Sequence, residues 1–308
     1  MKGLPICVTA LVLFTITSTS SLGWSSESGI YSFGVVPQFE QRKLFRIWRP
    51  ILNELERRTG LTFNLKGSSK IPVFEHKYIE GAYDFAYMNP YHMLKAHDSQ
   101  GYLPLVRDGG RMLKGILVVS KDSPIKSVQE LAGKHVAFPA PNALGASLLI
   151  RADLMNLYGV QVSPHYVQTH SSVYLHVALD QYIAGGGVTS TLNAQKPEIR
   201  QKLRIIYETR PMNPHPISVH PRVSEAHWRR VLKALLEMGQ TEKGAALLAK
   251  IPMHKVVAAQ LDDYTPISSW GLDEFYTPLN NAQQSNQSMG GDAGRALRLQ
   301  EKTPVSSQ

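Results

Sequence analysis

The stretch that most constrains the fold is residues 81–94, where an alternating pattern ends in an Asn-Pro pair. An aromatic residue occupies every second position from 83 to 87, and this period of two predicts a short β-strand. Asn89 then stands in the N-cap position of the next helix, with Pro90 in its first turn, where proline's missing N–H costs no hydrogen bond. The following backbone N–H groups have no partner within the helix, so this turn can bind an anion or a carbonyl oxygen.

Strand and helix patterns alternate through most of the chain. Between residues 42 and 59, apolar residues recur at the spacing of one buried helical stripe, and Gly60 ends the pattern. Repeated strand–helix–strand order implies an α/β fold, with right-handed crossovers, mostly parallel sheets flanked by helices, and ligands bound beyond the carboxyl ends of the strands. The predicted strands are 30–36, 61–65, 83–88, 103–106, 116–120, 135–138, 165–168 and 204–207, and the predicted helices are 42–59, 72–80, one after Pro90, 127–132, 142–158, 171–182, 224–238, 241–249 and 254–261.

Two such α/β units predict a two-lobed protein. Lobe 1 is expected to contain residues 29–113 and 217–275, and lobe 2 residues 114–216, so that the chain crosses between the lobes twice. Three prolines between positions 211 and 216 punctuate the return crossing. Residues 276–308 are rich in Asn, Gln, Ser and Gly with few large apolar side chains, so this tail is predicted to be disordered.

The amino-terminal residues have the order of a secretory signal. Lys2 precedes an apolar run over residues 4–16 and a small-residue stretch that ends at Gly23, which predicts a signal peptide over residues 1–23 and a periplasmic location. The run is too short for a permanent membrane span. Cys7, the single cysteine, lies within the signal, so the exported chain is expected to have neither disulfides nor thiolate chemistry.

The formal net charge of +9 favours an anionic ligand or surface. Basic residues occur as isolated pairs on predicted helix faces, as at Arg57-Arg58, without a long basic run. A solvated helix face explains such pairs better than nucleic-acid binding does. The chain is therefore expected to bind no nucleic acid, and we expect it to be a monomer.

Three further segments, taken in order along the chain, carry a family resemblance. They are residues 34–38 (Gly-Val-Val-Pro-Gln) with the helix that follows, residues 133–141 (Gly-Lys-His-Val-Ala-Phe-Pro-Ala-Pro), and residues 168–173 (Gln-Thr-His-Ser-Ser-Val). Together with the Asn-Pro turn, they resemble the periplasmic substrate-binding proteins of phosphate/phosphite/phosphonate-type ABC transporters. The resemblance implies a type 2 periplasmic-binding-protein fold that holds a small anionic or polar ligand in an interlobe cleft, needs no cofactor, and delivers the ligand to the membrane permease of an ABC importer.

Two departures from the family pattern narrow the range of expected ligands. The family's Ser-Thr-Ser-Gly type run, whose hydroxyl and N–H groups hold phosphoryl oxygens, is replaced by Asn-Ala-Leu-Gly-Ala-Ser at residues 142–147, which leaves the backbone donors of a helix start. Where the family often carries acidic residues for a ligand ammonium group, this chain has Ala-Gly-Gly-Gly-Val-Thr at residues 184–189. An aminoalkylphosphonate is therefore disfavoured, and a small oxyanion or another polar ligand without a cation is preferred.

The resemblance and the local patterns together indicate a set of candidate ligand-binding residues. His170 matches a histidine that faces the cleft in the family, and a protonated ring would add a charged donor. His92 either reaches the cleft or covers its helix, and Ser171 either contacts ligand or caps its helix. His215, between two prolines at the second crossing, either touches ligand or belongs to a rigid linker. The predicted ligand-binding set is Gln38, Asn89, Tyr91, His92, Asn142, Ala143, Gly145, His170, Ser171 and Gly187, the last because its backbone must pass close to the ligand or the opposite lobe.

Metal binding and catalysis have no recognisable motif in the sequence. The histidines include no pair at helical i, i+4 spacing and no His-Glu-x-x-His run. A nucleophile elbow and a phosphate-cradling Gly-Lys-Ser/Thr loop are absent from the sequence as well. We therefore expect no metal, no cofactor and no enzymatic activity. Two alternatives to import stay open: a ligand-sensing partner of a two-component sensor kinase, and an enzyme built on the same fold.

Overall fold

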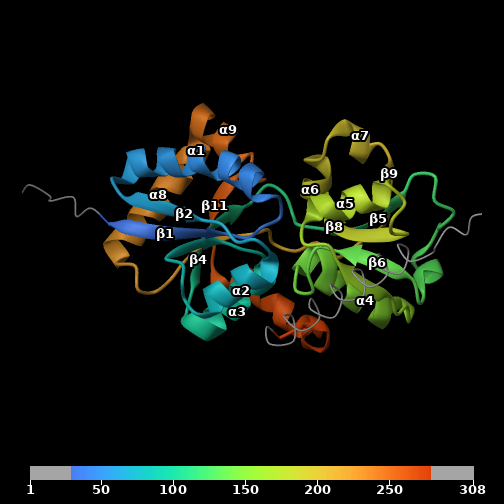
Figure 1. Ribbon diagram of the computed structural model, residues 1–308. Coiled ribbons are helices and arrows are strands. Elements are labelled where there is room, and N and C mark those ends of the chain that lie inside the picture. Colours follow the sequence, from blue (N-terminus) through green and yellow to red (C-terminus); the bar gives the residue numbers. More distant parts are fainter. Residues whose placement is uncertain (1–28, 279–308) are drawn as a thin grey trace, which may run out of the picture.

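The computed structural model describes residues 29–278 as two lobes, each built on one sheet flanked by helices (Figure 1). The first sheet has the strand order β11-β4-β10-β3-β1-β2, and the second has the order β7-β6-β8-β5-β9. The two-lobed α/β architecture expected from the sequence is confirmed, and the residue boundaries of the lobes stay predictions. The predicted signal peptide and residues 279–308 of the predicted tail lie outside the described residues.

Lobe 1 is made from the two ends of the described chain. In Figure 1, α1, α8 and α9 lie above its sheet and α2 and α3 lie below it. Its strands are β1 (Ile30–Val35), β2 (Thr62–Lys66), β3 (Phe85–Tyr87), β4 (Leu103–Asp108), β10 (Ile217–Val219) and β11 (Val256–Ala258). Its helices are α1 (Gln41–Thr59), α2 (Ile71–Ile79), α3 (Pro90–Gln100), α8 (Glu225–Gln240) and α9 (Glu242–Leu248), followed by the 3-10 helices η3 (Leu261–Asp263), η4 (Thr265–Trp270) and η5 (Leu272–Phe275).

Lobe 2 comes from the middle of the chain, with α5, α6 and α7 above its sheet and α4 below it in Figure 1. Its strands are β5 (Gly115–Ser120), β6 (His135–Phe138), β7 (Ser163–Tyr166), β8 (Ala184–Val188) and β9 (Leu203–Glu208). Its helices are the 3-10 turn η1 (Val128–Leu131), the π turn η2 (Leu144–Leu148), α4 (Leu149–Tyr158), α5 (His170–Ala178), α6 (Thr189–Asn193) and α7 (Pro197–Arg200).

The sequence predicts mostly parallel sheets, but both sheets are mixed. β10 pairs antiparallel with β3 and β4, and β5 pairs antiparallel with β8 and β9. β5 and β10 directly follow the two crossings, at residues 109–114 and 209–216, so each crossing inserts a reversed strand into its new sheet. The crossings run side by side, because Leu113 N donates to Met212 O at 2.8 Å and Met212 N donates to Leu113 O at 3.0 Å. We call this pair of connecting segments the hinge.

Aromatic side chains form the core between α1 and the first sheet. Phe33, Trp48, Phe63 and Phe85 are all at most 1% exposed, and Phe33 contacts the other three with ring centroids 5.2 to 6.3 Å apart. Burial of each such ring stabilises the fold by about 1.5–3 kcal/mol. The apolar stripe read from residues 42–59 therefore has its expected role, since it places α1 on the sheet beside the cleft.

Several predicted helices differ from the observed elements. Residues 254–261 are not a helix: β-branched Val256 and Val257 pair with β4 as the edge strand β11, and η3 follows. The helix predicted from residue 142 starts at Leu144 as a π turn, because Ser147 N and Leu148 N both donate to the Ala143 carbonyl. The helices predicted over 127–132 and 171–182 are the shorter η1 and α5.

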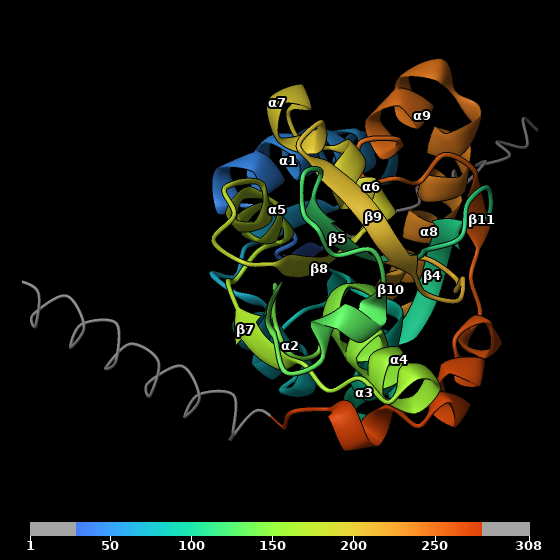
Figure 2. The same ribbon diagram turned by 90° about the vertical axis from the view of Figure 1, so that its right-hand side faces the viewer.

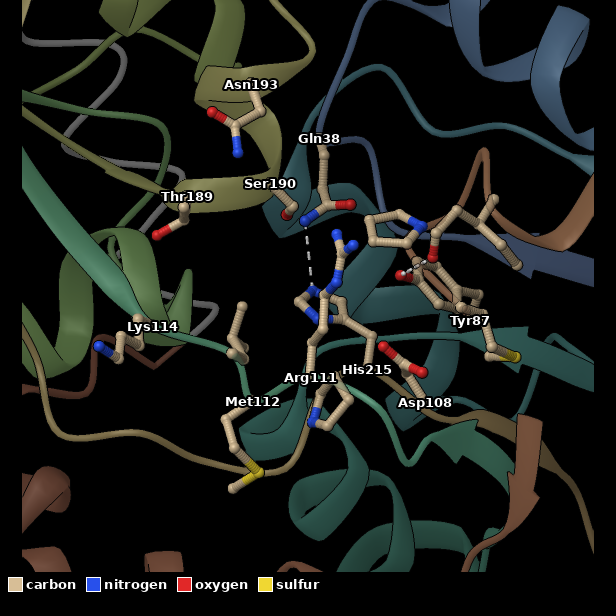
Figure 3. A pocket seen from close by; sticks show the side chains of 15 residues that line it. Gln38, Tyr87, Asp108, Arg111, Met112, Lys114, Thr189, Ser190, Asn193 and His215 are labelled. Atoms are coloured by element: carbon tan, nitrogen blue, oxygen red, sulfur yellow. Dashed lines mark hydrogen bonds between the residues drawn. The ribbon is translucent and has the colours of Figure 1, made fainter. Parts of the chain in front are cut away.

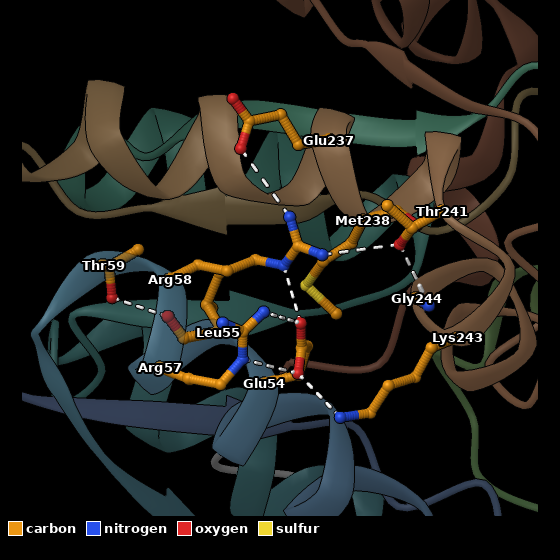
Figure 4. Close-up of polar contacts among 10 residues, drawn as sticks. All are labelled: Glu54, Leu55, Arg57, Arg58, Thr59, Glu237, Met238, Thr241, Lys243 and Gly244. Carbon is orange, nitrogen blue, oxygen red and sulfur yellow. Dashed lines mark hydrogen bonds and ion pairs between the residues drawn. The ribbon is translucent and has the colours of Figure 1, made fainter.

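A polar network fastens α1 to α8 and α9 on the far side of lobe 1 (Figure 4). Glu54, which is 5% exposed, accepts from Arg57 at 2.6 Å and Arg58 at 2.8 Å, and Lys243 approaches it at 3.3 Å. The hydrogen bond from Arg57 is the main reason why the pKa of Glu54 is lowered to about 2. Because Arg58 also reaches Glu237 and Thr241, one carboxylate organises the contact among three helices.

Candidate functional site

The lobes meet around a narrow chamber whose walls come from both lobes. Its volume is about 10 Å³, and the lobes touch directly at its rim. His170 N donates to Gln38 O at 3.2 Å, and Asn89 Nδ2 donates to Asn142 O at 3.4 Å. The lobes are therefore in a closed arrangement. The lining residues are Val36, Gln38, Ile71, Asn89, Ala143, Leu144, Gly145, Ala146, His170, Val188 and His215.

Lobe 1 presents the start of α3 to this chamber. Asn89 caps the helix as predicted, since its Oδ1 accepts from His92 N at 2.8 Å. Pro90 follows and has no N–H to satisfy, so the open backbone donor of the first turn is that of Tyr91. The cap therefore occupies the His92 N–H and leaves the Tyr91 N–H available to a ligand.

Lobe 2 presents the π turn η2, which replaces the hydroxyl-rich loop expected from the family. The N–H groups of Leu144, Gly145 and Ala146 open this helix, and N–H groups at that place have no carbonyl ahead of them within the helix. Gly115 lets the turn approach β5, because a Cβ there would collide with the Gly145 carbonyl oxygen. The turn is therefore pressed onto the sheet with its donors at the cleft, and we call these three N–H groups the amide cradle.

Two buried histidines complete the chamber. His170 Nδ1 lies 3.0 Å from Thr191 Oγ1, and His215 stacks on Tyr87 with the ring centroids 5.3 Å apart. Gln38 Nε2 donates to His215 Nε2 at 3.3 Å. Burial lowers the pKa of each histidine to about 3, so both rings are neutral at pH 7. Since the other lining residues are uncharged as well, the narrow chamber offers neutral donors to a ligand.

A wider chamber lies on the other side of the Gln38–His215 pair, beside the crossings (Figure 3). We call it the hinge-side chamber, and its volume is about 130 Å³. Asp108 at the end of β4, Arg111 on the first crossing and Thr189 at the start of α6 all line it. Figure 3 shows the Lys114 amine directed away from these groups, and Lys114 pairs with Glu208 at 2.9 Å. Its polar lining residues are Gln38, Asp108, Arg111, Lys114, Thr189, Ser190, Asn193 and His215.

Five predicted residues line the narrow chamber together: Gln38, Asn89, Ala143, Gly145 and His170. His215, whose role the sequence left open, lines both chambers. The sequence prediction missed three residues of the hinge-side chamber, Asp108, Arg111 and Thr189. Each lies next to a crossing or at the end of a strand, and this position is the sequence feature that could have pointed to it.

The other five predicted residues lie close by but are occupied by protein partners. Tyr91 donates its hydroxyl to Asp273 at 2.8 Å. His92 is fully buried and bonds Glu75 at 2.8 Å. Ser171 accepts from Gln195, and the Asn142 side chain bonds Glu75 and Thr277. Gly187 lies inside β8, where a Cβ would collide with the Tyr174 hydroxyl, so close packing within lobe 2 explains this glycine.

Residues 29–278 contain no group of three or more His, Cys, Asp or Glu side chains arranged to hold a metal ion. Within the same range, every helix is too short or too polar to cross a membrane. The arrangement of neutral donors and backbone N–H groups between two hinged lobes is suited to reversible binding of a polar solute.

Comparison with known proteins agrees with this geometry. A binding protein component of an ABC phosphonate transporter from Pseudomonas aeruginosa has a TM-score of 0.73 and 15% identity, covering 89% of this chain and 99% of that chain. PhnD1 from Prochlorococcus marinus, solved with methylphosphonate, has a TM-score of 0.71 and 14% identity, covering 79% and 97%. No curated protein sequence matches the chain. The sequence model of the phosphonate ABC transporter periplasmic substrate-binding proteins matches residues 33–264. The chain therefore belongs to the family of periplasmic substrate-binding proteins of phosphonate ABC transporters.

Proposed function

We propose that this protein captures a small oxyanion of the phosphonate or phosphite class in the interlobe cleft and delivers it to the permease of an ABC importer. The observation that carries the proposal is the convergence of two helix starts on one chamber. The residues of the amide cradle in lobe 2 and Asn89, the N-cap of α3 in lobe 1, line it together. Backbone N–H groups at helix starts stabilise bound anions. Gln38 and His170 would add side-chain donors from opposite lobes.

Ligand entry would require the lobes to separate. A chamber of about 10 Å³ has room for about one water molecule and is too small for a phosphonate. Rotation about the paired crossings would open the rim contacts between His170 and Gln38 and between Asn89 and Asn142. The ligand would then replace these contacts by bridging the same lobes, which links binding to closure.

The direct test is thermal melting with phosphate, phosphite, methylphosphonate and sulfite. An anion present at 100 times its Kd stabilises the native state by about 2.7 kcal/mol. For a domain of this size we expect the Tm to rise by ~5–10 °C. His170→Gln should reduce the rise, and Ser171→Ala, one residue away and outside the chamber, should not. Flat melts across the anion set would overturn the proposal.

The family consists of substrate-binding proteins and is not an enzyme family. We propose that this member likewise has no catalytic role and acts as a monomer. We also propose that residues 1–23 direct its export to the periplasm and are then removed by cleavage. A sensor-kinase partner is the alternative to a permease. Pull-down with the closed, ligand-bound protein separates the two, because capture of a permease supports import and capture of a kinase ectodomain supports sensing.

A further inference from the structure

The hinge-side chamber contains polar groups that have no partner in the protein. Asp108 is 2% exposed, and its Oδ1 accepts from Gly110 N at 3.1 Å and from Lys255 N at 2.8 Å. Its Oδ2 has no hydrogen-bond partner, and neither does Thr189 Oγ1. Among residues 29–278, no acceptor or carboxylate pairs with the Arg111 guanidinium. A buried acceptor without a donor is costly, so Asp108 Oδ2 and Thr189 Oγ1 call for an occupant, and the exposed Arg111 offers a free guanidinium to the same occupant.

The unpartnered groups define the chemistry of that occupant. A guanidinium pairs best with a carboxylate or phosphate, which it can bind through two parallel N–H bonds. Asp108 Oδ2 requires a donor, and the Thr189 hydroxyl can accept or donate. An anion alone would leave Asp108 Oδ2 unsatisfied, and a cation alone would make no contact with the Arg111 guanidinium. The matching group carries a carboxylate next to an ammonium or hydroxyl donor.

We propose that the hinge-side chamber binds the substituent of the ligand, and that this substituent is an α-amino or α-hydroxy carboxylate. The inference rests on the proposed function, in which the oxyanion lies on the amide cradle. Gln38 and His215 line both chambers and are joined by a side-chain hydrogen bond of 3.3 Å, so this pair forms a wall that the chambers share. With that bond broken in the open form, one ligand would contact both the amide cradle and Arg111.

This assignment changes the expectation from the sequence, which found no carboxylate at residues 184–189 to meet an amine. Asp108 supplies one from lobe 1, at the end of β4. The chamber volume of about 130 Å³ suits a substituent of a few heavy atoms, because a cavity of about 150 Å³ accepts benzene. Methylphosphonate would leave this chamber to water.

The test is calorimetric titration with four phosphonates that differ only in the substituent. Methylphosphonate has no polar substituent, 2-aminoethylphosphonate adds an ammonium, phosphonoacetate adds a carboxylate, and 2-amino-3-phosphonopropionate has both. We expect the last to bind at least about tenfold more tightly than methylphosphonate, the effect of roughly one additional charge-assisted hydrogen bond. Arg111→Ala should remove this gain and change the Kd of methylphosphonate less than about threefold.

Two further variants separate the roles of charge and geometry. Asp108→Asn keeps an acceptor for Gly110 N and Lys255 N, and it should weaken the amino acid phosphonate more than phosphonoacetate. Lys121→Ala removes an exposed cation elsewhere in lobe 2 and should leave all four affinities unchanged. Should Asp108→Asn fail to fold, the exposed Arg111 still decides the question.

The outcomes distinguish this inference from the function on which it rests. If methylphosphonate binds but the carboxylate-bearing ligands bind no more tightly, or if Arg111→Ala weakens all four equally, the substituent assignment is wrong and the oxyanion site stands. If no phosphonate binds, the proposed function fails and this inference fails with it.

Discussion

The two cleft histidines show how burial sets the chemistry of single residues. His170 and His215 are both buried, and burial lowers the pKa of each to about 3. In the unfolded chain the same rings have a pKa of about 6.5. Below pH 6.5 the unfolded state therefore binds more protons than the native state, and the free energy of unfolding falls as the pH falls. An anion on the amide cradle would oppose this shift by favouring protonated rings.

Replacing His170 by Gln should flatten part of this pH dependence. Between pH 7 and pH 5 the wild type should lose about 2 kcal/mol through this residue, because each pH unit below 6.5 costs about 1.4 kcal/mol. Urea unfolding at the two pH values measures the loss. Ser171→Ala is the matched control, since it changes the residue next to His170 without removing a titratable group and should leave the dependence as in the wild type. A His170→Gln protein with the full wild-type loss would show that the ring does not stay neutral in the fold.

The sequence identified the site residues that carry a local signal. Asn89 precedes a proline at a helix start, so the capping rule locates it, and Ala143 and Gly145 lie where the chain resembles the family's ligand loop. Tyr91, His92 and Asn142 were chosen by the same rules, but their polar atoms are taken by Asp273, Glu75 and Thr277. Those partners lie 182, 17 and 135 positions away in the chain, so only the folded structure reveals them. Whether the chamber residues bind ligand stays a prediction.

At the scale of elements, the loop between β6 and η2 joins both lobes through Asn142. Its Nδ2 donates to Thr277 O at 2.8 Å and to Glu75 Oε2 of α2 at 3.4 Å, and its Oδ1 accepts from Thr277 N at 2.9 Å. The residue is fully buried and lies two positions before the amide cradle. We therefore interpret Asn142 as a positioning residue that stabilises the closed form.

Asn142→Asp should weaken ligand binding by about tenfold or more, because two carboxylates would face each other and two donated hydrogen bonds would be lost. Adding Glu75→Gln places an amide at position 75 that can donate to the new carboxylate at position 142. The double variant should therefore recover part of the affinity. The measurements are the Kd and the dissociation rate. Weaker closure should change the dissociation rate more than the association rate. A double variant as weak as the single one would contradict this role.

The contact of α1 with α8 and α9 should depend on Glu54. Glu54→Gln should lower the free energy of unfolding at pH 7 by about 1.5–3 kcal/mol, the range for hydrogen bonds to charged groups. Because the pKa of Glu54 falls to about 2, the wild-type advantage is present above pH 4.5 and disappears as the pH falls toward 2. Glu225→Gln, in an exposed pair with Arg229, should change stability by less than about 1 kcal/mol. Equal effects of both substitutions would contradict the account.

At the scale of the whole molecule, the lobes are joined by more than the two crossings. Figure 2 shows the segment after β11 passing beneath α3 and α4. Asp273 accepts from Tyr91 of α3 at 2.8 Å, and Phe275 O accepts from Arg151 of α4 at 3.0 Å. The segment thus contacts both lobes in the closed form, and it must release one of them when the cleft opens.

Local patterns predicted the order of most strands and helices and hence the two-lobed architecture. They did not predict that the sheets are mixed, because the direction of β5 and β10 depends on how each crossing re-enters a sheet. They also missed β8, β10 and β11, which become strands by pairing with their neighbours in the sheets. Closure of the cleft depends on contacts between lobes and has no periodic signal in the sequence.

The central claim is that one anion is held between the amide cradle and the first turn of α3. A crystal structure with methylphosphonate tests it directly. The account predicts phosphonate oxygens within hydrogen-bond distance of the N–H groups of Leu144, Gly145 and Ala146, with Gln38 or His170 closing from the side. A phosphonate bound outside the interlobe cleft, or an empty cleft at a ligand concentration that saturates the protein in solution, would contradict it.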